Sequence, residues 1–163
     1  MEYDVVVVGG GPSGLSTAIK LKQLNPNINV CILEKAAEIG AHILSGNVFE
    51  TRALDELIPN WKDLNSPIKT KVKKEKFLFL SKSKSLSWPT WLLPKVQQNH
   101  KNYIISLANL CRWLAEQAEA LGVEIFPGFP ASEIIYNDDG SVKGVATQDL
   151  SLIHISEPTR LSV

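Results

Sequence analysis

Close to the start of the chain, a run of four valines leads directly into a glycine-rich turn. This junction constrains the fold more than any other segment. The segment EYDVVVVGGGPSGLSTAIKLKQL places the apolar run 5–8 immediately before the glycines. Such a run is typical of a strand covered on both faces. Helix-forming residues follow at helical spacing, and NINVCILEK supplies a second apolar strand. Residues 1–35 are therefore predicted to form the βαβ dinucleotide-binding unit of a Rossmann-like α/β fold.

Three of the four glycines in this segment, Gly9, Gly11 and Gly14, match the pattern G-x-G-x-x-G. In this pattern the first glycine permits a tight turn, the second lets a pyrophosphate approach the backbone, and the third lets the helix pack close to the strand. Pro12 and Ser13 stand at the predicted helix start, where free N–H groups and the helix dipole favour an anion. The loop is therefore predicted to bind the pyrophosphate of a dinucleotide, the alternative being a glycine-rich turn that binds nothing.

An acidic residue stands where the second strand of the unit is expected to end. Glu34 follows Gly14 by twenty positions, which suits a carboxylate that accepts hydrogen bonds from ribose hydroxyls. The same carboxylate would repel a 2′-phosphate, so NADP is disfavoured. The spacing by itself leaves FAD and NAD open.

The rest of the chain divides into a long excursion and a return to the main sheet. Residues 36–101 are predicted to form part of an inserted β-rich lobe, which contains the short helical patch RALDELI. In the return segment, residues 102–149, we expect a helix capped by Ser106 and ended by Gly122, then the strand VEIF and a hairpin around NDDG.

Composition excludes several functional classes. The formal net charge of +0 argues against a nucleic-acid partner, and no apolar run reaches the roughly 18 residues that a membrane span requires. No secretory leader or transit peptide is visible at the start of the sequence. Cys31 and Cys111 are expected in the core, far apart, so neither a metal site nor a catalytic residue is predicted.

Two longer blocks carry a family resemblance. GAHILSGNVFETRALDELIPNWK and NHKNYIISLANLCRWLAEQAEALGVEIFPGFPASEIIYNDDGSVKGVATQD resemble electron-transfer flavoprotein:ubiquinone oxidoreductase, over Met1 to Asp149. The resemblance implies a truncated FAD-binding domain of the glutathione-reductase type. It implies a longer parent enzyme, of which this chain is a fragment. That enzyme would transfer electrons from reduced electron-transfer flavoprotein to a membrane quinone, through FAD and a [4Fe–4S] cluster in its missing C-terminal part. That parent would lie peripherally on the cytoplasmic side of a bacterial inner membrane, and this fragment alone is expected to be inactive.

The resemblance also implies roles for individual residues. The glycine loop would hold the FAD pyrophosphate, Glu34 would hold the adenosine ribose, and the following loop would approach the flavin. The cofactor-binding set is Gly9, Gly11, Pro12, Ser13, Gly14, Glu34, Lys35, Gly40, Ala41, His42, Ser45 and Gly46.

Several interpretations stay open at this point. His42 either hydrogen-bonds the flavin or is satisfied by backbone. The lysines from Lys69 to Lys84 either dock an acidic protein or form a solvated face. Four apolar side chains either face the membrane interface or the quinone tail or pack within the second lobe, namely Trp88, Trp91, Leu92 and Leu93. A geranylgeranyl-reductase-like flavoprotein and a flavin module that only binds are the alternative functions.

The final segment differs in character from the rest. Back-translated, LSLIHISEPTR fits a widely used transposase-type sequencing adapter in a single reading frame, and the family resemblance stops at Asp149. Residues 150–163 are therefore predicted to be non-native, and His154 and Ser156 receive no catalytic role.

Overall fold

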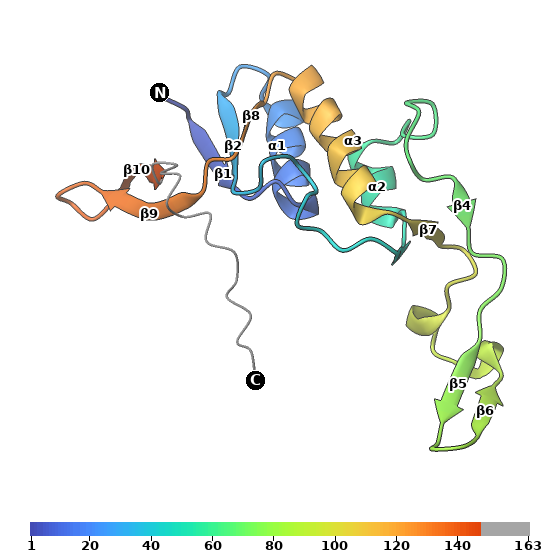
Figure 1. Ribbon diagram of the computed structural model, residues 1–163. Helices are drawn as coiled ribbons and strands as arrows, with labels where there is room; N and C mark the ends of the chain where they lie inside the picture. The colour runs from blue at the N-terminus through green and yellow to red at the C-terminus, as the bar shows by residue number, and fades with distance from the viewer. Residues whose placement is uncertain (148–163) are drawn as a thin grey trace.

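A three-stranded parallel sheet forms the centre of the computed structural model, which describes residues 1–147 (Figure 1). Its strand order is β1-β2-β8, and Val5 pairs with Val30 while Cys31 pairs with Glu124. The predicted β-turn-α-β unit and the third strand are both confirmed. The predicted non-native tail lies outside the described residues. The strands are β1 (Val5–Val8), β2 (Val30–Glu34) and β8 (Glu124–Pro127).

Two helices, α1 (Pro12–Leu24) and α3 (Leu107–Ala120), pack beside each other on one face of this sheet (Figure 1). Side chains from both helices and from β2 form the core between the layers. The largest fully buried side chains of this core are Leu15, Ile19, Val30, Ile32, Leu110 and Cys111.

The predicted limits of α3 are confirmed. The Ser106 hydroxyl accepts a hydrogen bond from the N–H of Asn109 at 3.4 Å, and Gly122 follows the helix with φ +83°. Leu121, between the end of the helix and Gly122, is 41% exposed. Trp113 is buried in α3, and its indole N–H donates to the carbonyl of Leu64 at 3.0 Å.

The first part of the predicted inserted lobe packs into the main core. The short helix α2 (Arg52–Leu57) contributes Leu54, and the chain after it contributes Ile58, Trp61 and Ile68 to the same apolar cluster as α1 and α3. Residues 54–68 therefore share a hydrophobic core with the nucleotide-binding unit.

A hairpin lies beside the other face of the parallel sheet, the face that the helices do not cover. Strands β9 (Ala131–Tyr136) and β10 (Val142–Thr147) pair antiparallel around the turn ending in Gly140, as predicted. A groove of about 940 Å³ separates the hairpin from the sheet and is lined by Val6, Leu33, Phe126, Ile135 and Val145.

The remaining residues form an arm that extends away from the parallel sheet (Figure 1). At its base, β7 (Tyr103–Ile105) pairs antiparallel with two short strands, in the order β3-β7-β4. At its far end, β5 and β6 make a separate hairpin, followed by two 3₁₀ turns. No helix in residues 1–147 is long and apolar enough to cross a membrane. The arm elements are β3 (Asn47–Phe49), β4 (Thr70–Lys71), β5 (Phe77–Leu80), β6 (Ser85–Trp88), η1 (Thr90–Leu92) and η2 (Lys95–Gln97).

Candidate functional site

The glycine loop joins the carboxyl end of β1 to the start of α1. Gly9 adopts φ +103°, a conformation that residues with a side chain rarely adopt, and its N–H donates to the carbonyl of Leu33 at 2.7 Å. A Cβ on Gly14 would overlap with the Gly9 carbonyl oxygen, so this position allows the close approach of helix to strand. Both glycines therefore have the conformational roles that the sequence predicts.

The start of α1 is open toward solvent. Gly11 is the N-cap residue with φ −81°, and no atom lies within 4 Å of a Cβ built on it. The helical ladder begins when the N–H of Leu15 donates to the Gly11 carbonyl at 3.0 Å. The N–H groups of Ser13 and Gly14 precede this bond in the first turn, where intrahelical acceptors are lacking. Together these groups form a cradle that suits an anion.

Glu34 ends β2, and its carboxylate lies beside the glycine loop. Oε2 accepts a hydrogen bond from the Gly10 N–H at 2.7 Å, and Oε1 accepts one from the Ala36 N–H at 2.8 Å. Each oxygen of a carboxylate has two acceptor sites, so this pair of bonds leaves acceptor capacity for hydroxyl groups. The predicted ribose ligand is thus oriented by backbone on both sides.

Sequence reasoning missed Gly10 as a residue of this site. Gly10 is buried, and a Cβ on it would overlap with Cδ1 of Ile39, which is itself 8% exposed. The signal available was that Gly10 is the middle one of three consecutive glycines, at a position that the pattern G-x-G-x-x-G treats as variable. Only the fold shows that Ile39, from the loop after β2, lies against this position.

The other predicted site residues lie on the loop after β2. Gly40 is buried, with φ +86°, and a Cβ on it would lie 2.9 Å from the carbonyl oxygen of Ala108 in α3. The loop turns back on itself where the N–H of Ala41 donates to the Glu38 carbonyl at 3.3 Å. The structure therefore holds the start of this loop against α3. The remaining predicted residues are exposed, namely Lys35, Ala41, His42, Ser45 and Gly46.

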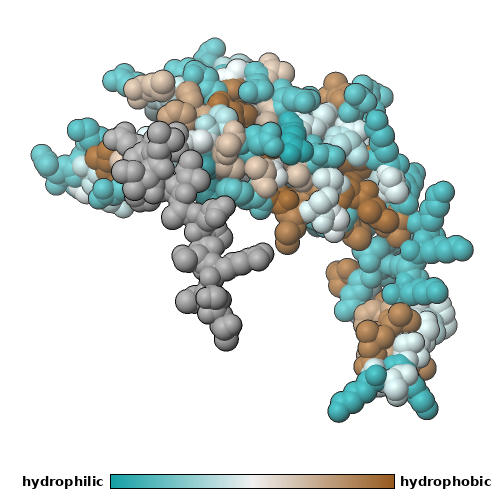
Figure 2. Space-filling view, in the orientation of Figure 1, coloured by the Kyte–Doolittle hydropathy of each residue, from teal (hydrophilic) through white to brown (hydrophobic). Residues whose placement is uncertain are grey.

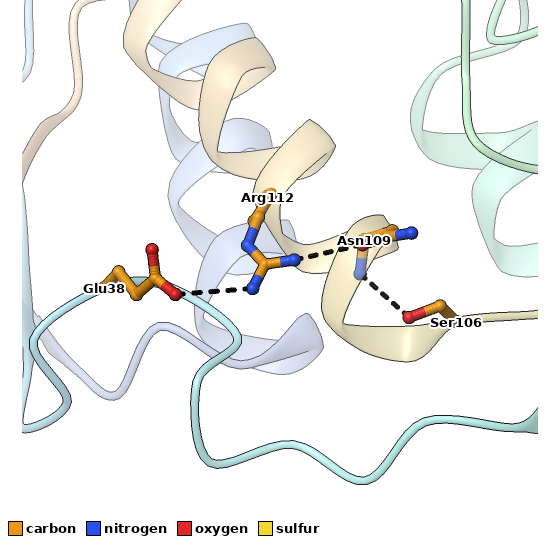
Figure 3. Close-up of polar contacts among 4 residues, drawn as sticks. All are labelled: Glu38, Ser106, Asn109 and Arg112. Atoms are coloured by element: carbon orange, nitrogen blue, oxygen red, sulfur yellow. Dashed lines mark hydrogen bonds and ion pairs between the residues drawn. The ribbon is translucent and has the colours of Figure 1, made fainter.

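Polar contacts on the surface also join this loop to α3 (Figure 3). The guanidinium of Arg112 lies 3.5 Å from the Glu38 carboxylate and donates to the Asn109 side chain at 3.0 Å. Exposed ion pairs of this kind contribute about 0–1 kcal/mol, so the pair orients the loop without dominating its stability.

The thiol of Cys111 lies close enough to Glu34 to be affected by its charge, but it is not expected to react. Cys111 is fully buried, and burial, with a smaller effect of the Glu34 charge, raises the pKa of its thiol to about 11. Such a thiol stays protonated at neutral pH and lacks the thiolate that nucleophilic or metal-binding cysteines need. Within residues 1–147, no group of three or more His, Cys, Asp or Glu side chains is arranged to hold a metal ion.

Comparison with known proteins places these features in a family context. The model of the Thi4 family matches residues 1–57, which contain the glycine loop and Glu34. The chain is 53% identical over 155 residues to a mitochondrial electron transfer flavoprotein-ubiquinone oxidoreductase of Dictyostelium discoideum, covering 93% of this chain and 25% of the relative. It is 52% identical over 165 residues to a probable electron transfer flavoprotein-ubiquinone oxidoreductase of Acinetobacter baylyi, covering 98% of this chain and 29% of the relative.

A solved structure supports the fold at greater evolutionary distance. A geranylgeranyl bacteriochlorophyll reductase-like protein of Thermoplasma acidophilum superposes with a TM-score of 0.64 at 22% identity, covering 89% of this chain and 34% of that protein. This likeness shows a shared Rossmann-like fold. By sequence, the chain is a relative of the electron transfer flavoprotein-ubiquinone oxidoreductases, which it matches along nearly its whole length while spanning about a quarter of theirs.

Proposed function

We propose that the chain binds FAD through the glycine loop and Glu34. The observation that carries the proposal is the position of the Glu34 carboxylate, which is held by the N–H groups of Gly10 and Ala36 beside the open N-terminus of α1. A pyrophosphate at the helix start and a ribose at the strand end are adjacent parts of one dinucleotide. The spacing of anion cradle and carboxylate therefore fits the adenosine half of FAD.

Under this proposal each part of the site has a distinct task. The backbone N–H groups at Gly11, Ser13 and Gly14 bind the pyrophosphate, with Gly9 and Pro12 setting the turn and the helix start. Glu34 accepts bonds from the ribose hydroxyls. The flavin end lies along the loop after β2, formed by Lys35, Gly40, Ala41, His42, Ser45 and Gly46.

Bound FAD supplies the redox chemistry, while the protein binds and orients it. The names of the relatives include an electron transfer flavoprotein and ubiquinone. We infer that the whole protein passes electrons from reduced electron-transfer flavoprotein to a membrane quinone. A [4Fe–4S] cluster would belong to a part of the parent beyond this chain, and the protein would lie peripherally on the cytoplasmic side of a bacterial inner membrane.

A prenyl-reducing function is the main alternative, because the Thermoplasma acidophilum structure is geranylgeranyl reductase-like. Its identity to this chain is 22%, against 53% for the Dictyostelium discoideum oxidoreductase. The stronger sequence relationship favours the electron-transfer function. A complete parent enzyme that reduced a geranylgeranyl substrate, and did not oxidise reduced electron-transfer flavoprotein, would reverse this preference.

The FAD site is tested by Gly11→Val. The side chain would occupy open space in front of the loop, so the fold should survive while the pyrophosphate is blocked. Gly144→Val is the matched control, because a Cβ at this position would also meet no atom within 4 Å. Gly144 lies on β10, in the β9–β10 hairpin and not in the glycine loop. Circular dichroism should be unchanged for both variants. FAD titration by flavin fluorescence should show loss of binding for Gly11→Val alone, and equal FAD binding by both variants would place the cofactor elsewhere.

A further inference from the structure

An apolar groove of about 670 Å³ runs between α1 and α2 and begins beside the glycine loop. The positions of α1 that line it recur every three or four residues from Pro12 to Leu24. At a rise of about 1.5 Å per residue, the groove therefore follows α1 for roughly 18 Å. Leu110 and Leu114 of α3 lie at its base, since both are almost fully buried. The apolar lining side chains are Leu21, Leu24, Phe49, Leu54, Leu57, Leu110 and Leu114.

The groove is open to solvent in the described part of the chain. Ser13, Thr17 and Ala53 on its walls are exposed, and Leu24 is 73% exposed at the end of α1. Small side chains such as these let a further helix approach to the usual axial distance of about 8–10 Å. The groove therefore has the length, the apolar base and the small-residue walls of a position for one more helix.

We propose that an amphipathic helix from the part of the parent outside this chain lies in this groove. The chain spans 25% and 29% of the two relatives compared above, so about three quarters of such a protein lies outside it. The helix would place apolar side chains against Leu110 and Leu114 and charged ones beside the exposed Lys20 and Glu56. Occupation of the groove does not require FAD, so it can be tested apart from the proposed cofactor site.

Backbone hydrogen bonding favours a helix over an extended segment as the occupant. The long walls of the groove are α1 and α2, whose interior N–H and C=O groups bond within each helix. An extended segment between these walls would find no strand edge to pair with, and buried backbone groups without partners are rare in native proteins. A helix satisfies its own backbone groups and packs by its side chains alone.

A second copy of this chain offers no suitable helix within residues 1–147. The apolar side chains of α1 and α3 belong to the core, and α2 has only six residues. Figure 2 shows apolar side chains gathered over the β5–β6 hairpin at the far end of the arm, where strands carry them. The helix that fits the groove therefore has to come from another part of the parent.

The test measures cysteine labelling in the full-length parent. Thr17→Cys places a thiol in the groove, and Glu116→Cys is the matched control on α3, outside the groove; both positions are exposed in this chain. In the native parent, N-ethylmaleimide should label Thr17→Cys at least about 100-fold more slowly than Glu116→Cys, because a covered thiol reacts only after local opening. In this chain alone, and in the parent in guanidinium, the two rates should be similar. Mass spectrometry of digests locates the label.

Photo-crosslinking identifies what covers the groove. The photoreactive residue p-benzoylphenylalanine replaces Leu24, which stands at the end of the groove. Irradiation of the full-length parent should give crosslinks within one polypeptide, to residues that follow Asp149. Crosslinked positions should lie three or four residues apart, as on one face of a helix. Circular dichroism verifies that each substituted parent is folded.

Four results would overturn the proposal. Equal labelling of Thr17→Cys and Glu116→Cys in the native parent would show that the groove stays open. Crosslinks to a second copy or to a different protein would identify another occupant. Crosslinked positions two residues apart would indicate a strand. Slow labelling of Thr17→Cys without any crosslink to the later residues would indicate a small apolar ligand.

Discussion

The carboxylate of Glu34 accepts a hydrogen bond from the backbone N–H of Gly10 at 2.7 Å, although the two residues are 24 positions apart. The bond ties the end of β2 to the glycine loop, and the second oxygen binds the Ala36 N–H at 2.8 Å. Glu34 therefore has a structural task in addition to its proposed role at the ribose. The two tasks can be separated by experiment.

Glu34→Ala should weaken FAD binding by about 10- to 150-fold. A hydrogen bond to a charged group contributes about 1.5–3 kcal/mol, and each 1.4 kcal/mol changes the dissociation constant tenfold. The same variant should lower the melting temperature of the protein without FAD, because two backbone N–H groups lose their acceptor. Flavin fluorescence titration and thermal unfolding measure the two effects.

Glu38→Ala is the control for this prediction. Glu38 lies on the same loop, but its carboxylate contacts only the exposed Arg112 at 3.5 Å among the described residues. The dissociation constant for FAD should change less than threefold in this variant. An unchanged FAD dissociation constant in Glu34→Ala would disprove the ribose assignment, whatever happens to the melting temperature.

Gly10→Ala should destabilise the protein by about 1–3 kcal/mol, the usual cost of overpacking a filled site. The new methyl group would overlap with Cδ1 of Ile39, a side chain that is 8% exposed. Ile39→Val removes that atom, so it should recover much of the lost stability in the Gly10→Ala background. Chemical denaturation of both single variants and the double variant measures the coupling.

Gly11→Ala serves as the control, since its Cβ would meet no atom within 4 Å and φ is −81°. Its free energy of unfolding should stay within about 0.5 kcal/mol of the parent, as for surface substitutions. Strict additivity of Gly10→Ala and Ile39→Val would contradict the predicted contact.

Asp55 should make the stability depend on pH in the acid range. Its carboxylate accepts hydrogen bonds from the Trp61 indole N–H at 2.7 Å and the Thr51 hydroxyl at 2.9 Å, and these bonds lower the pKa of Asp55. A lowered pKa in the folded state stabilises the protein above the ordinary carboxyl pKa of about 4. This stabilisation is lost as pH falls through the lowered value.

Asp55→Asn keeps an oxygen acceptor for Trp61 but cannot titrate. At pH 7 the variant should melt about 1–3 °C below the parent, consistent with a solvent-screened charge worth roughly 0.5–1 kcal/mol. The gap should narrow as pH falls from 4 toward 2 in thermal unfolding experiments. A gap that is constant across this range would show that the Asp55 charge does not contribute.

Both cysteines should resist alkylation in the folded protein. Cys111 is fully buried with its pKa raised to about 11, and Cys31 is 2% exposed with a pKa that burial raises. At pH 8, iodoacetamide should label the native chain at least 100-fold more slowly than the chain in 6 M guanidinium, because attack requires an accessible thiolate. Mass spectrometry of Cys31→Ala isolates Cys111, and rapid native labelling there would contradict its place in the core.

The local elements of this protein could be predicted because their signals lie close together in the sequence. The run Val5–Val8 followed by glycines, the Ser106 cap with Gly122, and the turn at Gly140 each specify a short segment. Propensities and capping bonds act over a few residues, so such elements follow from neighbouring side chains. The roles of individual residues in binding FAD remain a prediction, which the experiments above test.

The contacts that shape the site depend on which distant segments meet. Ile39 fills the space beside Gly10 only because β2 lies next to β1, and Trp61 joins the core only because α2 packs against α1. A one-dimensional pattern records the apolar character of these residues but not their partners.

By itself, the sequence determined a βαβ unit with an anion-binding loop and an acidic residue at the end of its second strand. The tertiary structure decided that Glu34 hydrogen-bonds Gly10, that residues 54–68 share the core of that unit, and that the large apolar side chains of β5 and β6 stay exposed. The physical reason is that local conformation depends on nearby residues. Burial, close approach and exposure depend on how the whole chain closes on itself.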